Sequence, residues 1–282
     1  MTDANLAAGV SQWATRSGSV WARRWRDTDA GLAGLAPYLL AAVKESAPGA
    51  VRAFEIGCGP GSTALEVAAA LPDAEIVACD VSSELAGIAR QRAVDLPHVR
   101  VVEGDAEVVA RSEGPFDLFF SRHGTMFFDD PVQAFGSFRS AATTGASLVF
   151  SCFQSWESNP WASALACAVA DRELPAPGRE PSGFAFADPA YVRDIFAASG
   201  WVESDLHDVR FNYVAGQGAD AVDHALGFFS ELGPSARLLE SPSKQERSDA
   251  LDRMRTLIEQ HHDGGRVSFP AAAWIWSAKA GA

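Results

Sequence analysis

The sequence predicts an α/β fold in which a mostly parallel sheet of seven strands carries helices on both faces. Short apolar runs alternate with segments of helical periodicity between residues 51 and 153, which is the pattern of a parallel sheet with crossover helices. The runs are apolar throughout, as in strands buried on both sides. A glycine-rich loop, Gly57-Cys58-Gly59-Pro60-Gly61, follows the first run and leads into a helical segment. Such a loop turns backbone N–H groups and a helix N-terminus toward one spot, so we expect a nucleotide-like ligand there.

Composition limits the classes of partner. Of the 282 residues 48% are hydrophobic, and the formal net charge is −13. A strongly acidic chain disfavours nucleic acids and anionic membranes. We expect no signal peptide and no membrane span. The cysteines form no C-x-x-C pair, and Cys58, Cys79 and Cys152 lie in or beside predicted strands, which indicates buried free thiols and a cytoplasmic location.

The first half of the chain divides into an N-terminal segment and a sheet core. Residues 1–28, with Trp13, Trp21 and Trp25, are predicted either to pack on the core as a helix or to cap the ligand. A helix is predicted over 29–47, with Leu32, Leu35, Leu39 and Val43 on one face. The core, residues 29–153, contains predicted strands at 51–56, 75–79, 99–102, 116–120 and 147–150. Asp130-Pro131 should begin a helix whose buried face is Val132, Phe135 and Phe138.

The second half departs from this regular alternation. Residues 154–187 form a proline- and glycine-rich excursion with one short helix, which we expect to be a lid. Residues 188–282 complete the core, with a helical insertion at about 215–265. Predicted elements are a helix from Asp188 to Gly200, a strand over 205–214, helices over 219–233 and 243–262, and a strand over 268–278. Ser243 and Glu246 should form a capping box at the start of the second inserted helix.

The glycine loop distinguishes between nucleotide classes. A dinucleotide fingerprint ends in glycine or alanine, whereas Ser62 stands at that position here. The observed pattern is acid-x-Gly-x-Gly-x-Gly, from Glu55 to Gly61, and it resembles motif I of class I S-adenosylmethionine (SAM) methyltransferases. Asp80 ends the second strand about twenty residues later, at the spacing of a carboxylate that accepts ribose hydroxyls. Its alternative role is the N-cap of the following helix.

The resemblance implies a Rossmann-like fold, SAM as cofactor and S-adenosylhomocysteine as product. In that family the acid at Glu55 lies near the amino-acid end of SAM, the acid at Asp105 accepts a hydrogen bond from the adenine amino group, and the N–H of Ala106 reaches the ring. The candidate cofactor-binding residues are Glu55, Gly57, Cys58, Gly59, Gly61, Asp80, Val81, Asp105, Ala106, Ser121, Arg122 and Trp21. The segments SRHGTMFFDDP (121–131) and ESNPW (157–161) further resemble a bacterial subgroup akin to quinone- and sterol-type methyltransferases.

The candidate catalytic residue is His123, which follows the fourth strand at the ligand edge. A neutral imidazole can accept a proton from an acceptor, although the same residue can simply line the pocket. The lid aromatics would suit a flat, apolar acceptor and exclude water; they are Trp156, Trp161, Phe184, Phe186, Phe228 and Phe229. His261-His262 beside Asp263 is better explained as a helix C-terminal cap than as a metal site, and no metal is assigned.

We therefore predict a SAM-dependent methyltransferase that acts on a small aromatic or apolar metabolite, at oxygen or carbon, as a monomer or homodimer. The motif Asn/Asp-Pro-Pro-Phe/Tyr of amino-group methylation does not follow the fourth strand. Two alternatives remain. A SAM-binding module without catalysis would keep Glu55, Asp80 and Asp105 but lack an acceptor pocket. A nicotinamide-dependent oxidoreductase would need a hydride-relay pair such as Tyr-x-x-x-Lys, which the sequence does not contain.

Overall fold

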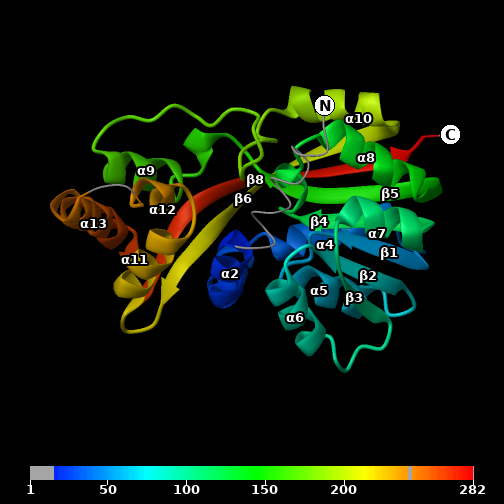
Figure 1. The fold of residues 1–282 in the computed structure, drawn as a ribbon, viewed down its shortest axis with the longest axis horizontal. Coiled ribbons are helices and arrows are strands. Elements are labelled where there is room, and N and C mark those ends of the chain that lie inside the picture. Colours follow the sequence, from blue (N-terminus) through cyan, green and yellow to red (C-terminus); the bar gives the residue numbers. More distant parts are fainter. Residues whose placement is uncertain (1–15, 241–242, 282) are drawn as a thin grey trace.

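The computed structural model describes residues 16–240 and 243–281, and these form one mixed α/β architecture (Figure 1). A single sheet has the order β3-β2-β1-β4-β5-β8-β6, and β7 pairs with β8 outside this path. The sheet has eight strands rather than the predicted seven, because the two-residue β7 precedes the last long strand. The strands are β1 (Arg52–Ile56), β2 (Glu75–Asp80), β3 (Val99–Glu103), β4 (Phe116–Arg122), β5 (Ala142–Phe153), β6 (Trp201–Gln217), β7 (His262–Asp263) and β8 (Arg266–Ala280).

The mostly parallel character of the sheet is confirmed. Strands β1 to β5 pair in parallel, and β8 runs antiparallel between β5 and β6. The carboxyl ends of β1, β2, β3 and β4 therefore meet at one edge. The helices are α2 (Arg16–Arg23), α3 (Trp25–Leu32), α4 (Ala36–Ser46), α5 (Ser62–Ala70), α6 (Ser83–Arg92), α7 (Ala106–Glu113), α8 (Pro131–Ser140), α9 (Ser163–Ala170), α10 (Pro189–Ser199), α11 (Ala221–Glu231), α12 (Pro234–Leu238) and α13 (Lys244–Gln260).

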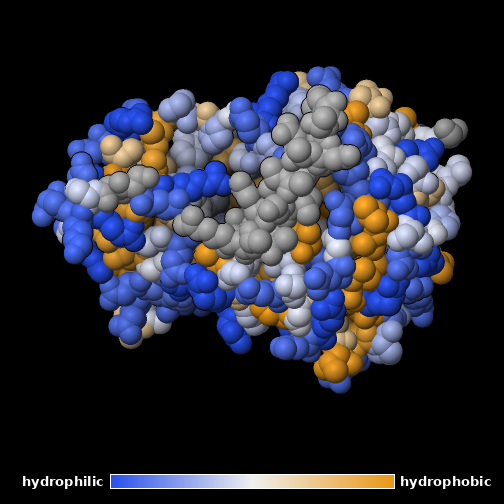
Figure 2. Space-filling model, in the orientation of Figure 1, coloured by the Kyte–Doolittle hydropathy of each residue, from blue (hydrophilic) through white to orange (hydrophobic). Residues whose placement is uncertain are grey.

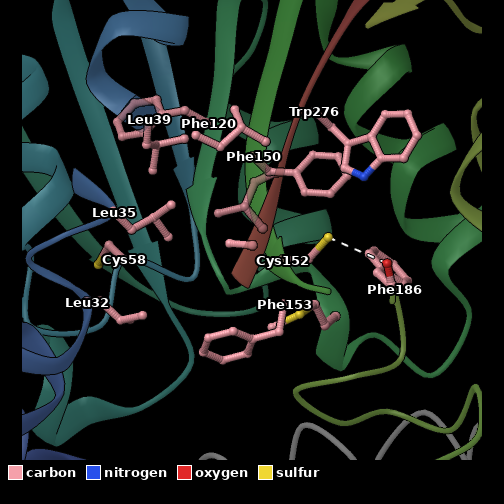
Figure 3. Close-up of a cluster of buried hydrophobic side chains, with 14 of the residues drawn as sticks. Leu32, Leu35, Leu39, Cys58, Phe120, Phe150, Cys152, Phe153, Phe186 and Trp276 are labelled. Carbon is pink, nitrogen blue, oxygen red and sulfur yellow. Dashed lines mark hydrogen bonds between the residues drawn. The ribbon is translucent and has the colours of Figure 1, made fainter. Parts of the chain in front are cut away.

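The predicted continuous helix over 29–47 is wrong, because the chain forms two helices, α3 and α4, instead. Pro37 lies in the first turn of α4, where its missing N–H and its ring would disrupt a continuous helix at the carbonyl of Ala33. The predicted apolar face is nevertheless buried, and Figure 3 shows Leu32, Leu35 and Leu39 in one cluster of buried side chains that also contains Cys58 and Phe120. Residues 1–15, which include Trp13 and much of the predicted cap, lie outside the described residues.

Three predicted helix boundaries are confirmed by their caps. Asp130 accepts a hydrogen bond from the N–H of Gln133, Asp188 accepts one from Ala190, and Ser243 and Glu246 form the capping box. The prediction for Val132 is wrong: its side chain is 40% exposed, whereas Phe135 and Phe138 are fully buried. Val132 lies on the flank of the helical face that Ala134, Phe135 and Phe138 share, so it does not point into the core.

The long strands β6 and β8 extend beyond the rest of the sheet. β5 pairs with β8 only over Ala273–Lys279, whereas residues 268–272 of β8 pair with β6 alone and residues 266–267 pair with both β6 and β7. Both strands exceed their predicted ranges of 205–214 and 268–278. Helices α9, α11, α12 and α13 contact one another around this extension, on the left of Figure 1. We call residues 209–217 and 266–272 together with these four helices the arm.

The visible surface is predominantly polar over both the arm and the core, and its apolar patches are small and separate (Figure 2). None of the described helices has both the length and the apolar character needed to cross a bilayer. The apolar residues gather inside, where Phe54, Phe116, Phe119 and Phe138 pack ring against ring between the sheet and its helices. The core thus holds the strand ends in place for the groups described next.

Candidate functional site

The glycine loop between β1 and α5 adopts a backbone that side chains disfavour. Gly57, Gly59 and Gly61 have φ values of 64°, 54° and 84°. A Cβ on Gly61 would lie 3.0 Å from that of Ala89, and one on Gly57 would lie 3.3 Å from the Cα of Gly124. A Cβ on Gly59 would meet no described atom within 4 Å. Gly57 and Gly61 are therefore needed for packing, whereas Gly59 borders open space that a ligand can fill.

Asp80 at the end of β2 holds this loop directly. Its Oδ2 accepts a hydrogen bond of 2.7 Å from the N–H of Gly59, and its Oδ1 accepts one of 2.8 Å from Ser82. Burial raises the pKa of Asp80, and the two hydrogen bonds oppose that rise. The N-cap of α6 is Ser82 rather than Asp80. Asp80 therefore orders the loop, and the remaining lone pairs of its carboxylate can still accept ligand hydroxyls.

Glu55 lies inside β1 and is the least satisfied acidic group of the site. Its side chain is 1% exposed, and Oε2 has no hydrogen-bond partner among the described residues. Burial raises the pKa of Glu55 well above its ordinary value, and the nearby positive charge of Arg122 opposes this. A buried carboxylate without a partner is destabilising unless a donor or cation meets it. Glu55 could thus accept a cationic group of a ligand, such as an ammonium.

The ends of β3 and β4 supply further groups to the same edge. Asp105 caps α7: its Oδ1 accepts hydrogen bonds from the N–H groups of Glu107 and Val108, and its Oδ2 accepts no hydrogen bond from the described residues. Ala106 begins α7, and Val81 directly follows Asp80. Ser121 is fully buried and links β4 to β1, because its Oγ donates to the carbonyl of Ile56 at 2.6 Å. Its hydroxyl supports the loop from behind.

His123 has an unusual backbone and an unpaired ring nitrogen. Its φ of 60° is rare for a non-glycine residue. Nδ1 lies 2.8 Å from the Oγ of Ser151, while Nε2 is buried without a partner among the described residues. Burial, with a smaller contribution from the charge of Arg122, lowers the pKa of His123 to about 3. The imidazole is therefore neutral at physiological pH and acts as a hydrogen-bonding group rather than a cation.

An aromatic row leads from His123 into the arm. The ring of His123 lies 4.1 Å from that of Phe153, Phe153 lies 4.9 Å from Trp161, and Trp161 stacks nearly parallel on Tyr213 at 4.6 Å. Phe184 stacks on both Phe153 and Trp161. We call His123, Phe153, Trp161 and Tyr213 the aromatic row. Phe228 and Phe229 of α11 pack against Tyr213 at its far end.

Sequence reasoning did not find the contribution of helix α3. Asp29 on α3 accepts hydrogen bonds from Arg92 of α6 and Arg122 of β4. These partners are 63 and 93 residues away in sequence, so no local pattern could reveal them. Tyr213 and Arg92 were missed for the same reason. Trp21 lies on α2 and is partly buried against the core, and Cys58 is buried inside the loop.

Residues 53–145 match the family described as Methyltransferase domain. Over 103 residues, 36% of this chain, the sequence is 29% identical to a malonyl-[acyl-carrier protein] O-methyltransferase from Halalkalibacterium halodurans. The aligned segments span 25% to 38% of the length of the curated relatives that the chain matches.

Two solved structures share the fold. One is a protein from Bacillus halodurans described as a methyltransferase, with 15% identity, a TM-score of 0.55, and coverage of 86% of this chain and 99% of the other. Another is the [4+2]-cyclase SpnF, with 18% identity, a TM-score of 0.51, and coverage of 86% and 80%. Three observations lead to the same assignment: the conformation of the glycine loop, the acidic residues at three strand ends and the segment that matches the family. Residues 53–145 of this chain belong to a class I, SAM-dependent methyltransferase domain.

Proposed function

We propose that the chain binds SAM at the glycine loop and transfers its methyl group to a small aromatic or apolar molecule, at oxygen or carbon. The observation that carries the proposal is the buried Oε2 of Glu55, which has no partner in the described part of the chain, beside a loop that Asp80 fixes at the N–H of Gly59. An unpaired buried carboxylate destabilises the free protein, so its presence is best explained by a cationic ligand.

The cofactor-binding roles follow from these positions. Glu55 would accept hydrogen bonds from the ammonium group, Asp80 from the ribose hydroxyls, and Asp105 from the adenine amino group through its Oδ2. The N–H groups of Val81 and Ala106 lie beside these acids in sequence. Gly57, Cys58, Gly59 and Gly61 would contribute backbone contacts, and Ser121, Arg122 and Trp21 complete the proposed set. The bound cofactor supplies a methyl group already activated by a positively charged sulfur.

The protein's part in catalysis is then to align the acceptor and to exclude water. The aromatic row offers a flat apolar wall, and aromatic faces also favour a nearby sulfonium. His123 would contact the acceptor through Nε2. With a pKa of about 3, His123 is a weak base, so its role is to orient the nucleophile by a hydrogen bond. An acceptor that ionises by itself, such as an acidic phenol, an enol or a carboxylic acid, suits this site best.

The test begins with calorimetric titration of the purified protein with SAM, S-adenosylhomocysteine and NADH. Binding of both sulfur compounds without NADH is the expected result, and NADH binding without SAM would overturn the proposal. A screen of phenols, quinols and hydroxy acids with SAM, read by mass spectrometry, then identifies methylated products. SAM binding without any methylated product would favour the alternative of a SAM-binding module without catalysis, or a SAM-binding protein with another activity. The fold allows this, because SpnF shares it. Size measurement in solution tests the predicted monomer or homodimer.

A further inference from the structure

Asp29 is the centre of a hydrogen-bonded cluster that joins helix α3 to the glycine loop. Its Oδ2 accepts from Arg92 Nη1 at 3.0 Å and, by a short hydrogen bond, from the Oγ of Ser62. Its Oδ1 accepts from Arg122 Nη2 at 2.7 Å. The Asp29 side chain is only 18% exposed. One carboxylate from the N-terminal segment thus contacts the start of α5, the end of α6 and the end of β4.

Arg92 attaches this cluster to the loop itself. Its Nη1 donates to the carbonyl of Pro60 and to the Oγ of Ser62, both at 2.9 Å. Its guanidinium lies 4.5 Å from the centre of the Trp25 ring at the start of α3. Because α3 touches Arg92 through both Trp25 and Asp29, the position of this helix depends on the conformation of the glycine loop.

Arg122 carries the cluster toward the interior of the site. Its side chain is 10% exposed, and its positive charge opposes the rise in pKa that burial causes in Glu55 and Glu66. Only Nη2 forms a hydrogen bond within the described part of the chain. A guanidinium has further N–H donors at Nε and Nη1, and paired donors of this kind match a carboxylate. Asp29 therefore pairs with Nη2 of Arg122, and the N–H groups at Nε and Nη1 remain available to a ligand.

We propose that Asp29 is a positioning residue that holds Arg122 ready for the carboxylate of the cofactor's amino-acid part. The inference rests on the proposed function. That part of the cofactor carries one ammonium and one carboxylate. The site offers one acid whose Oε2 has no partner among the described residues, Glu55, and one half-paired arginine, Arg122, close enough to interact electrostatically. Asp29 restricts the rotamers of Arg122 before the ligand arrives, which lowers the entropy lost on binding. Helix α3 thereby completes the cofactor site.

The test compares two ligands that differ only at the amino-acid end. S-adenosylhomocysteine carries that end, whereas 5′-methylthioadenosine keeps the nucleoside and the thioether without it. Calorimetry on the full chain measures both ligands with the wild type, Asp29→Asn, Asp29→Glu and Arg122→Gln. We expect Asp29→Asn and Arg122→Gln to weaken S-adenosylhomocysteine about tenfold, the scale of losing one charged hydrogen bond, and to leave 5′-methylthioadenosine within about twofold. Asp29→Glu keeps the charge and should restore part of the loss.

Asp27→Asn is the matched control, because Asp27 lies on the same helix but contacts Arg24 and His224 instead. It should bind both ligands as the wild type does. Equal weakening of both ligands in Asp29→Asn would reduce Asp29 to a structural anchor and overturn the inference, as would unchanged affinity for S-adenosylhomocysteine. Arg122→Gln leaves α3 intact and tests the same contact if Asp29→Asn unfolds. A wild type that binds neither S-adenosylhomocysteine nor SAM would overturn the proposed function itself, which separates the two failures.

Discussion

The strand ends of the core and the arm are stabilised in opposite ways. At the strand ends, Glu55, Asp80 and His123 are buried polar groups, and two of them have an unpartnered atom in the described structure. In the arm, Tyr213, Phe228 and Phe229 are buried aromatic side chains, and Tyr213 stacks on both phenylalanines. Buried polar groups without partners lower stability, whereas stacked aromatic rings raise it. We conclude that the edge of the core is suited to bind a ligand, whereas aromatic packing stabilises the arm.

The largest expected effect separates these two regions with a pair of glycines. Gly59 in the loop and Gly264 in the β7–β8 turn have φ values of 54° and 56°, and a Cβ on either meets no described atom within 4 Å. Alanine at either position should therefore cause the same backbone strain and lower the free energy of unfolding by ~1–2 kcal/mol. Only Gly59→Ala should also weaken S-adenosylhomocysteine, by ~2 kcal/mol, because its methyl fills the ligand's space.

Urea unfolding and calorimetry measure both quantities for the two variants. Equal loss of ligand affinity in Gly59→Ala and Gly264→Ala would show that the loop and the arm are not energetically separate, which would contradict the comparison.

Glu55→Gln should weaken the binding of SAM and increase the stability of the free protein. Losing the charged acceptor should weaken SAM by ~1.5 kcal/mol, while removing a buried acid should raise the free energy of unfolding by ~1 kcal/mol at neutral pH. Because the pKa of Glu55 is raised in the folded state above its ordinary 4.5, its contribution to stability is present below that value and is lost as pH rises. The advantage of Glu55→Gln should therefore grow with pH. A variant that is less stable than the wild type at pH 8 would argue that Oε2 of Glu55 has a partner within the protein.

Tyr213→Phe examines the arm side of the site. Burial raises the pKa of Tyr213, so its phenol stays protonated, and its Oη forms no hydrogen bond among the described residues. Phenylalanine would stack on Trp161 equally well. We expect the free energy of unfolding to stay within ~0.5 kcal/mol of the wild type and the SAM affinity to be unchanged. If the hydroxyl contacts the acceptor, kcat/KM for the acceptor should fall by a factor that corresponds to ~1 kcal/mol.

The matched control is Tyr191→Phe on α10, which packs on Phe186 away from the aromatic row and should leave turnover unchanged. A loss of SAM affinity in Tyr213→Phe would place the arm in the cofactor site instead of the acceptor site.

The smallest effect concerns pH. Since the pKa of His123 is about 3, kcat/KM should show no inflection from this residue between about pH 5 and pH 8. The pKa of His123 in the folded protein lies below its ordinary 6.5. The neutral imidazole therefore contributes stability to the fold that is fully present above pH 6.5 and is lost as pH falls toward 3. His123→Asn, which tolerates the positive φ, should make this acid-side loss of stability shallower. A rate that titrates near pH 6.5 in the wild type and loses that inflection in His123→Asn would restore His123 as a general base.

Much of the core was predictable because its signals are local. The apolar runs predicted β1 to β5, and the glycine spacing predicted the loop whose three positive φ values the structure confirms. Asp130, Asp188 and Ser243 were correctly predicted as helix caps because a cap depends on residues within one turn. The acids at strand ends followed from the rule that parallel strands present their carboxyl ends at one edge.

The remaining features were decided by contacts between distant parts of the chain. Residues 266–272 of β8 pair with β6, and at their start with β7, beyond the last residue that pairs with β5, and this pairing created the arm. The periodicity of the sequence does not set how far a strand extends past its neighbours. The contact with Ser151 fixed the orientation of the His123 ring, and burial rather than residue type kept its imidazole neutral by lowering its pKa. Asp29 reached Arg92 and Arg122 only because the fold brings α3 to the ends of α6 and β4. The sequence by itself determined which chemical groups reach the ligand edge; the tertiary structure decided which of them are paired and which are left for a ligand, because pairing depends on three-dimensional proximity.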